Sequence, residues 1–309
     1  MEEGRAVRFR LGTRGSPLAL AQAAMVRDAL CTAHGWAEDA IETVVIRTTG
    51  DRVQDRALAE IGGKALWTKE LDRALLAGEV DACVHSMKDV ETVRPDSIRL
   101  AGTLPRADVR DRLIGAPSID ALPKGARIGS SSPRRRAQLL SHRADLDVVL
   151  FRGNVDTRLG KLAAGEVDAT LLAAAGLDRL GRNGVGSAVP IDVMLPAPAQ
   201  GAVGIEVRRD DDAATRPLAG VSHEATFRCV LAERALLAAL RADCHSPVGA
   251  LATITASGTL QLTAELLDED GTERVTGSHE GQDPASVGQA LAADLLGRAP
   301  AGVRRLFNG

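Results

Sequence analysis

Lys88 and Asp89 place a cation and a carboxylate side by side, a few residues after a short apolar run at residues 82–84. That run is small and uninterrupted, which is typical of a strand buried on both faces of a parallel sheet. In open α/β sheets ligands bind beyond the carboxyl ends of strands, so this pair would lie where a substrate binds. The ammonium could bind an acidic substrate, and the carboxylate could stabilise a positive charge or move a proton. Taken alone, the two residues fit a solvated surface ion pair equally well.

A basic segment lies at residues 126–161, where eight Lys or Arg stand against three Asp, a local balance of +5 in a chain with a net charge of −3. Arginines at this density favour bidentate recognition of several carboxylates or phosphates. A solvated helix face would explain Arg136 and Arg143. It explains poorly the five basic residues that fall just beyond predicted strand ends, which are Arg14, Lys88, Arg134, Arg135 and Arg152. A nucleic-acid surface ranks third, because this segment lacks interleaved aromatics and any DNA-reading module.

Cys244 is a candidate nucleophile, because it lies just after a predicted helix, in a polar segment between Arg241 and His245. Neighbouring basic groups can lower the pKa of a thiol and activate it. An ordinary loop cysteine is the alternative. A Cys244–His245 protease pair is disfavoured, because adjacent side chains usually cannot fold back on one another and no protease signature surrounds them. Cys31, Cys83 and Cys229 lie in apolar periodic settings and are predicted to be small buried hydrophobes.

The elements that position these residues alternate strand and helix, which predicts an α/β class with parallel sheets. The pattern also repeats. Ser16-Pro17 and Ser132-Pro133 each predict an N-cap followed by proline at the first helical position. The segment at 76–82 is echoed at 163–169, where a helix ends at glycine and a strand follows. Two such lobes would form a cleft between them, and both helix starts would favour an anion there.

Composition excludes several classes of protein. The 309 residues suggest two or three domains, and no run of about 18 uncharged apolar residues predicts a membrane span. Aromatics make up 2%, so stacking platforms for nucleic acid are nearly absent. The start of the sequence lacks an export signal, which predicts a cytoplasmic protein with reduced thiols. The absence of any Cys-x-x-Cys spacing predicts no metal site.

Seven spaced segments together resemble the porphobilinogen deaminase (hydroxymethylbilane synthase) family, and the resemblance runs almost end to end. Cys244 stands at that family's cofactor-attachment position. The segments are TRGSPLAL at 13–20, GGK at 62–64, HSMKDV at 85–90, SSPRR at 131–135, RGNV at 152–155, AGLDRLG at 175–181 and QGAVG at 200–204.

The resemblance implies two lobes like those of type II periplasmic binding proteins, with a cleft between them, and a small C-terminal α+β domain that carries the cysteine. The expected first lobe spans residues 1–104 and 197–220, because the strand-like segment at 202–207 would return to it. The second lobe would span 105–196, and the C-terminal domain 221–309. A monomer is expected.

The implied reaction joins four porphobilinogen molecules head to tail, with loss of ammonia at each addition, and releases linear hydroxymethylbilane by adding water. The chain would grow on a dipyrromethane cofactor attached through a thioether to Cys244. Asp89 would stabilise the cation that forms when ammonia leaves. The resemblance assigns cofactor contacts to Lys88, Asp89, Ser131, Ser132, Arg134 and Arg135. It assigns substrate contacts to Arg14, Ser16, Lys64, Trp67, Arg152, Gly153, Asn154, Arg158, Arg179 and Gln200.

Four positions depart from the usual family pattern. Glu60 stands where a basic residue is common, Ala65 replaces a glycine and Trp67 replaces a phenylalanine. Glu91 replaces a proline and is expected to loosen the segment after Asp89. The competing function is a non-catalytic two-lobed protein that binds an organic anion, and it has no need of a cysteine-bound primer.

Overall fold

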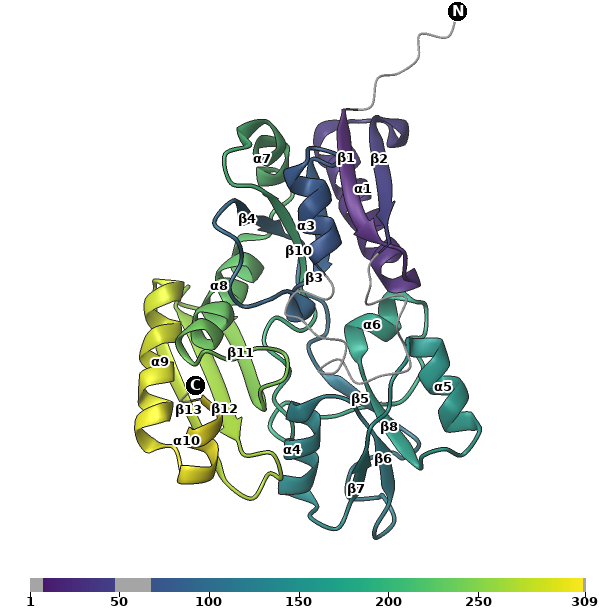
Figure 1. The fold of residues 1–309 in the computed structure, drawn as a ribbon, viewed down its shortest axis with the longest axis vertical. Helices are drawn as coiled ribbons and strands as arrows, with labels where there is room; N and C mark the ends of the chain where they lie inside the picture. The colour runs from purple at the N-terminus through teal and green to yellow at the C-terminus, as the bar shows by residue number, and fades with distance from the viewer. Residues whose placement is uncertain (1–7, 48–67, 308–309) are drawn as a thin grey trace, which may run out of the picture. The chain divides into compact units, whose positions relative to one another are not determined.

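The computed structural model describes residues 8–47 and 68–307, which form two compact units (Figure 1). Met1–Arg106 and Ala202–Phe227 make the first unit, and Ala107–Gly201 and Arg228–Gly309 make the second. Within the described ranges there are three sheets, and each has an apolar core on at least one face. Two α/β lobes and a smaller α+β part are therefore confirmed.

The sheet of the first unit has five described strands in the order β2-β1-β3-β10-β4. Its strands β1, β2 and β3 run parallel, whereas β10 is antiparallel to both β3 and β4. The return of the 202–207 segment to this sheet is thus confirmed, and the expected parallel sheet is present as a trio to which β10 adds an antiparallel strand. The strands are β1 (Phe9–Arg14), β2 (Ile41–Ile46), β3 (Ala82–Ser86), β4 (Ile98–Thr103) and β10 (Val203–Arg208).

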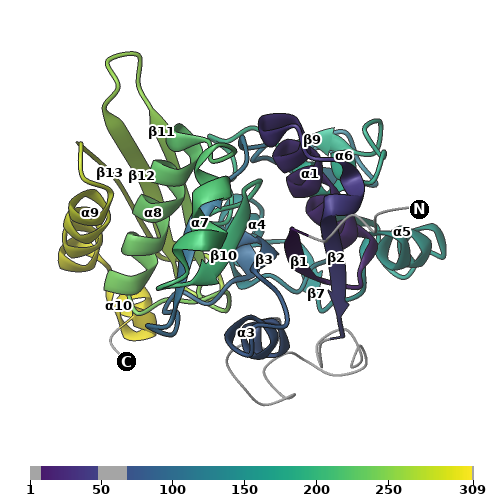
Figure 2. The ribbon, with the colours of Figure 1, turned by 90° about the horizontal axis from the view of Figure 1, so that it is seen from above.

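Helices cover both faces of this sheet (Figure 2). On one face α1 (Pro17–His34) and α7 (Asp212–Ala219) pack their apolar residues against β1, β3 and β10. On the other face α3 (Lys69–Leu76) packs Leu71 and Leu75 against Cys83 of β3. Because Ala82 and Val84 face the first core, β3 is buried on both faces, as its apolar run predicted. Two short 3-10 turns, η1 (Glu38–Ala40) and η2 (Met87–Asp89), complete the unit.

The second unit contains a sheet with the same arrangement, which explains the repeat in the sequence. Its described strands lie in the order β7-β6-β8-β5-β9, in which β7, β6 and β8 are parallel and β5 is antiparallel to both β8 and β9. These are β5 (Asp111–Ile114), β6 (Arg127–Gly129), β7 (Asp147–Val149), β8 (Ala169–Ala173) and β9 (Ser187–Ala188). Its helices are α4 (Pro133–His142), α5 (Val155–Ala163) and α6 (Ala174–Arg179).

An antiparallel sheet follows in the same unit, in the order β11-β12-β13 over the residues that are described. Its strands are β11 (Val248–Ile254), β12 (Leu260–Leu267) and β13 (Arg274–Gly281). One face packs against α8 (Glu224–Ala239) and α9 (Pro284–Arg298), and α10 (Ala301–Phe307) closes the same core.

Both predicted serine caps are present. Ser16 Oγ accepts the N–H of Ala19, and Ser132 Oγ accepts the N–H of Arg135. The echoed segments also match in structure, because α3 and α5 are each followed by a glycine in the left-handed region, Gly78 (φ 71°) and Gly165 (φ 76°). Only a residue without a Cβ adopts this conformation at little cost, so the two glycines end their helices in the same way.

Cys83 and Cys229 are buried, as expected, whereas Cys31 is only partly buried and Cys244 is exposed. No disulfide links these four cysteines, all of which lie in the described part of the chain. Among the helices of residues 8–47 and 68–307, none has the length and apolar character to span a bilayer.

Candidate active site

The turn after β3 presents the carboxylate that the sequence singled out. Met87 and Val90 are buried on either side of it, and the N–H of Met87 donates to Ala202 O at 3.1 Å. Gly204 of β10 must be glycine here, because a Cβ at that position would lie 2.0 Å from Met87 Sδ. These anchors leave Asp89 exposed and Lys88 partly buried at the carboxyl end of the strand. The turn is therefore fixed by apolar packing while its carboxylate stays accessible.

A pocket of about 50 Å³ lies beside this turn within the first unit, and Asp89 lines it together with Arg14 and Ser16. Arg14 is the last residue of β1, and Ser16 is the N-cap of α1. Three predicted site residues from three segments thus converge. Lys88 is outside the described lining of the pocket, and Lys64, Trp67, Glu60 and Ala65 lie outside the described residues.

Four further polar residues line the pocket that were not predicted as site residues, and they are Gln22, Thr68, His85 and Ser86. Gln22 Nε2 donates to Ser86 Oγ at 2.7 Å, and His85 lies on the neighbouring strand position. Gln22 is 2% exposed on the inner face of α1. The sequence did contain a signal for Gln22. It occupies a position of the helix that the apolar periodicity places inward, and a buried amide needs hydrogen-bond partners.

A partly buried ion network links β10 and α3 to the segment that follows the turn. Arg94 contacts three carboxylates in the first unit, those of Asp72 at 2.5 Å, Glu206 at 2.7 Å and Glu91 at 2.8 Å. Glu91 also accepts a hydrogen bond from Thr68 Oγ1 at 2.7 Å. The sequence predicts that Glu91 loosens the segment after Asp89. Its contacts show the opposite, because its side chain links that segment to Arg94.

Glu206 gives this network a pH dependence. Burial alone would raise the pKa of Glu206, but contacts with His85 and Arg94 outweigh burial and lower the pKa to about 2. Since the pKa in the folded state lies below the ordinary value of 4.5, the carboxylate stabilises the fold above pH 4.5, and that stability is lost as pH falls toward 2.

We expect Glu206→Gln to destabilise the protein most near pH 7, by on the order of 3 kcal/mol. The difference from wild type should shrink steadily between pH 4.5 and pH 3. Urea unfolding at several pH values measures it, with Glu79→Gln, an exposed glutamate of the same unit, as the control. A difference that is constant across this range would contradict the account.

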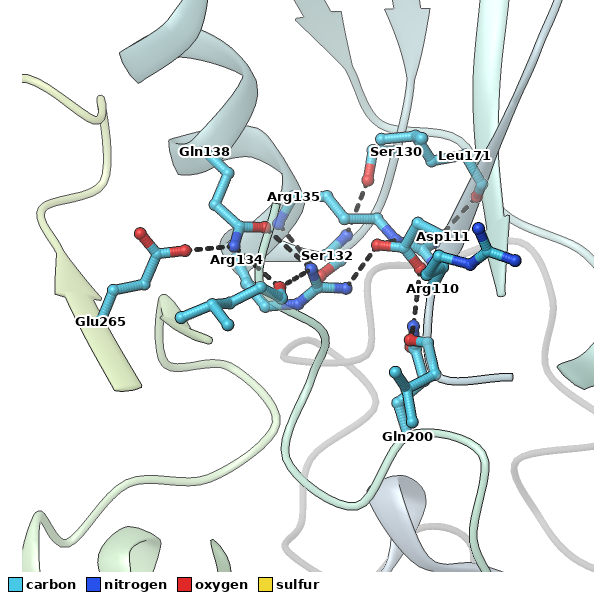
Figure 3. Close-up of polar contacts among 12 residues, drawn as sticks. Arg110, Asp111, Ser130, Ser132, Arg134, Arg135, Gln138, Leu171, Gln200 and Glu265 are labelled. Atoms are coloured by element: carbon cyan, nitrogen blue, oxygen red, sulfur yellow. Dashed lines mark hydrogen bonds and ion pairs between the residues drawn. The ribbon is translucent and has the colours of Figure 1, made fainter. Parts of the chain in front are cut away.

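In the second unit the paired arginines converge on one carboxylate (Figure 3). Arg134 Nη2 lies 2.8 Å from Asp111 Oδ2, and Arg135 Nη2 lies 2.8 Å from Asp111 Oδ1. The two arginine residues are 3% and 6% exposed. Sequence reasoning missed Asp111, which begins β5 and is 2% exposed, so its carboxylate needs a partner.

Burial and charge oppose each other in this cluster. Burial alone would raise the pKa of Asp111, but Arg135 and Arg134 hold it well below its usual range. Burial lowers the pKa of Arg134 from its ordinary value, and Asp111 opposes that effect. Two guanidinium groups therefore share the Asp111 carboxylate, and Glu265 is a second carboxylate that acts on Arg134.

The cluster extends in two directions within the second unit (Figure 3). Gln200 is fully buried, and its Nε2 donates to Asp111 Oδ1 at 2.8 Å. Arg134 Nη1 donates to Gln138 Oε1 at 2.8 Å, and Gln138 Nε2 donates to Glu265 of β12 at 2.5 Å. Gln200 is thus placed to orient Asp111, and a polar chain joins α4 to the C-terminal sheet.

Asp111→Asn is expected to lower the free energy of unfolding by about 3 to 5 kcal/mol, because two buried cations lose their shared counter-ion. Asp108→Asn is the matched control, since Asp108 forms a similar pair with Arg110 that is much more exposed. That pair should contribute about 1 kcal/mol or less. Urea unfolding compares the variants, and equal losses would contradict the central place given to Asp111.

Three of the predicted arginines each have one buried donor without an acceptor among the described residues. Within the described residues, Arg134 Nε, Arg152 Nη1 and Arg179 Nε are buried without a hydrogen-bond partner. Burial also lowers the pKa of Arg179, whose Nη2 donates to Gly201 O at 2.7 Å. Unsatisfied buried donors are costly, and a carboxylate ligand is the natural acceptor for a guanidinium.

The segment at residues 152–158 carries two of the predicted arginines, Arg152 and Arg158, and holds them in place. Asn154 is the N-cap of α5, and its Oδ1 accepts the N–H of Thr157 at 2.8 Å. Gly153 has φ 129°, and a Cβ there would lie 2.6 Å from Thr157 Cγ2. Arg158 Nε donates to Gly153 O at 3.0 Å, and its Nη2 reaches Ser131 Oγ at 3.4 Å. Gly153 and Asn154 therefore shape the backbone that carries Arg152 and Arg158.

Cys244 lies in the loop between α8 and β11, in the same unit as the arginine cluster. Its Sγ is 3.6 Å from His245 Nδ1. The expectation that the adjacent histidine cannot fold back is therefore wrong, because the turn at 243–246 directs both side chains to the same side. An exposed thiol next to an imidazole has the composition of a nucleophilic site.

Comparison with known proteins gives a consistent result over nearly the whole chain. Residues 9–216 match the family model of the porphobilinogen deaminase, dipyromethane cofactor binding domain, and residues 227–297 match that of the porphobilinogen deaminase, C-terminal domain. The porphobilinogen deaminase of Sphingopyxis alaskensis is 57% identical, covering 97% of this chain and 96% of its own. That of Paracoccus denitrificans is 52% identical over 95% of each chain. The chloroplastic enzyme of Pisum sativum is 44% identical over 97% of this chain and 84% of its own.

Solved structures with some likeness include a VFT2 domain and a substrate-binding domain. The VFT2 domain of BvgS from Bordetella pertussis is 15% identical, with a TM-score of 0.41 over 69% of this chain and 85% of its own. Substrate-binding domain 2 of GlnP from Lactococcus lactis is 12% identical, with a TM-score of 0.42 over 70% and 89%. The family matches confirm the resemblance carried by the seven segments and favour the synthase over the anion-binding alternative.

Proposed function

We propose, for a chain that belongs to the porphobilinogen deaminase family, that Asp89 and Cys244 carry the two chemical roles of its reaction. The enzyme is a transferase of tetrapyrrole and haem biosynthesis. It condenses four porphobilinogen molecules with loss of ammonia and releases hydroxymethylbilane. Its cofactor is dipyrromethane, which supplies the pyrrole carbon to which the first substrate is joined.

The described residues fit this cofactor. Each pyrrole unit of dipyrromethane carries an acetate and a propionate, so the group is an anion with several carboxylates. Three buried guanidinium N–H groups of the second unit have no acceptor among the described residues. The donor set thus has the charge and hydrogen-bonding capacity that several carboxylates require. In our assignment Cys244 holds the group through a thioether, while Ser131, Ser132, Arg134, Arg135, Lys88 and Asp89 contact it.

Asp89 is the residue assigned to the chemistry of ammonia loss. When the aminomethyl nitrogen leaves, the substrate becomes a cation delocalised onto the pyrrole nitrogen. An exposed carboxylate on a turn fixed by Met87 and Val90 can accept the pyrrole N–H and stabilise that charge. It can also relay the proton that makes ammonia a leaving group. The observation that carries this assignment is the position of Asp89 beside Arg14 and Ser16 in one pocket.

The basic residues are assigned to substrate carboxylates. Arg14 in the first unit and Arg152, Arg158 and Arg179 in the second would bind acetate and propionate groups as they accumulate. Ser16 would add a neutral donor at the start of α1. Lys64 and Trp67 keep the substrate-binding roles that the family resemblance implies. Gly153 and Asn154 would act by shaping the backbone that carries the arginines at 152 and 158. Gln200 would act by orienting the Asp111 carboxylate.

We also propose bounds for the domains, a compartment and an oligomeric state. We assign residues 1–104 and 197–220 to the first lobe, 105–196 to the second and 221–309 to the C-terminal domain, which is supported by the three separate sheets. Four cysteines without a disulfide suit a reducing, cytoplasmic compartment. The enzyme would act there as a monomer on a small molecule, without nucleic acid or membrane. Sedimentation of the purified chain tests the oligomeric state.

Product stoichiometry tests the proposed function directly. The purified chain, incubated with porphobilinogen, should release four ammonia molecules for each hydroxymethylbilane formed. An anion-binding protein would bind porphobilinogen and release none, and that result would contradict the proposal.

A further inference from the structure

The loop that carries Cys244 is held by its own side chains. It leaves α8 at Arg241, which has φ 53°, a left-handed conformation that turns the chain away from the helix. Ala242 and Val248 are buried on either side, whereas Asp243, Cys244 and His245 are exposed. Asp243 Oδ1 accepts the N–H of His245 at 2.9 Å, and the N–H of Asp243 donates to Ser246 Oγ at 3.1 Å. The loop is anchored while its three polar side chains stay accessible.

One imidazole nitrogen faces both of its neighbours in this loop. His245 Nδ1 lies 3.6 Å from Cys244 Sγ and 3.5 Å from Asp243 Oδ1. When Nδ1 is unprotonated it can accept the thiol proton. Once protonated, the same N–H lies between a thiolate and a carboxylate, and both anions stabilise it. Arg241 is the other basic residue of the loop, and it is exposed.

We propose that His245 is a catalytic residue for loading of the cofactor, the base that removes the thiol proton of Cys244 during attachment of the first pyrrole. This inference rests on the proposed role of Cys244. The S–H proton passes to His245 Nδ1, and the sulfur lone pair forms a bond to the aminomethyl carbon of porphobilinogen. The C–N bond breaks, and its electron pair leaves with the nitrogen as ammonia. The proton on His245 then passes to solvent, so the net products are a thioether and ammonium.

The expected size of the effect follows from the population of thiolate. An ordinary thiol with a pKa of about 8.5 is only about 3% ionised at pH 7. Lowering that pKa by about one unit raises the reactive fraction roughly five- to tenfold. The exposed setting of His245 keeps the expected effect within this range, because solvent screens exposed ion pairs.

Two measurements on the full chain test the role of His245. The chain is produced in a host that cannot make porphobilinogen, as wild type, as His245→Gln and as His279→Gln. The control changes an exposed histidine on β13 in the same way. The first measurement is the rate of alkylation of Cys244 by iodoacetamide between pH 6 and 9.5, from the mass of its peptide. The second is the rate of mass gain at Cys244 after porphobilinogen is added.

His245→Gln should shift the midpoint of alkylation to higher pH and slow both alkylation at pH 7 and mass gain by about five- to tenfold. His279→Gln should match wild type in both. Wild-type rates in His245→Gln would overturn the role of His245 and leave the role of Cys244 intact. Failure of the wild-type chain to gain mass at Cys244 would instead overturn the proposed function of the cysteine. Alkylation alone then decides whether His245 activates the thiol.

Discussion

Replacing Asp89 by Asn is expected to lower turnover of porphobilinogen by roughly 10²- to 10⁴-fold, while the fold is retained. The amide has the same shape as the carboxylate, so the buried anchors Met87 and Val90 should keep the turn in place. It cannot offset the charge of the cation that forms when ammonia leaves, and it cannot relay a proton. Initial rates of ammonia release measure the effect.

The controls separate chemistry from folding. Asp96→Asn changes an exposed aspartate of the same unit that lies outside the pocket lining, and it should retain wild-type turnover. Urea unfolding of Asp89→Asn should agree with wild type within about 0.5 kcal/mol, as for other surface substitutions. Near-normal turnover in a correctly folded Asp89→Asn protein would remove Asp89 from the mechanism.

Replacing Cys244 by Ser should abolish covalent loading and lower the synthesis of hydroxymethylbilane by at least about 10³-fold. A hydroxyl has the same shape as the thiol but a far higher pKa, so it cannot supply the nucleophile that binds the first pyrrole. Intact mass and product formation are measured on the same preparation. Since Cys244 is exposed, the substitution should leave the fold unchanged.

Cys31→Ser is the matched control for this change. Cys31 is a partly buried thiol on α1 of the first unit, so its replacement should leave both the adduct mass and the rate of synthesis unchanged. A Cys244→Ser protein that still carries the adduct would show that another residue holds the primer.

The features predicted well from sequence are those fixed by short-range patterns. The N-cap signals at Ser16 and Ser132 and the apolar run of β3 depend on neighbours in the chain, and the structure contains all of them. The exposed turn at Asp89 follows from the same run. The return of β10 to the first sheet came from the family resemblance, since no local pattern specifies a partner strand so far along the chain.

The features that sequence reasoning missed depend on contacts between distant segments. Asp111 pairs with arginines more than twenty residues away, and Arg94 is fixed by distant carboxylates of α3 and β10, so it can hold the nearby Glu91. The arginines at 134 and 135 were expected only as ligand contacts, yet both are buried against Asp111. The sequence shows that a charged residue is present, but the tertiary fold determines which counter-ion it contacts.

Cys244 as the point of attachment is the central claim, and mass spectrometry of the intact wild-type chain with peptide mapping tests it most directly. The account predicts an added mass of two linked pyrrole units on the peptide that contains Cys244. An adduct on any other residue, or a chain that stays unmodified after incubation with porphobilinogen, would contradict it.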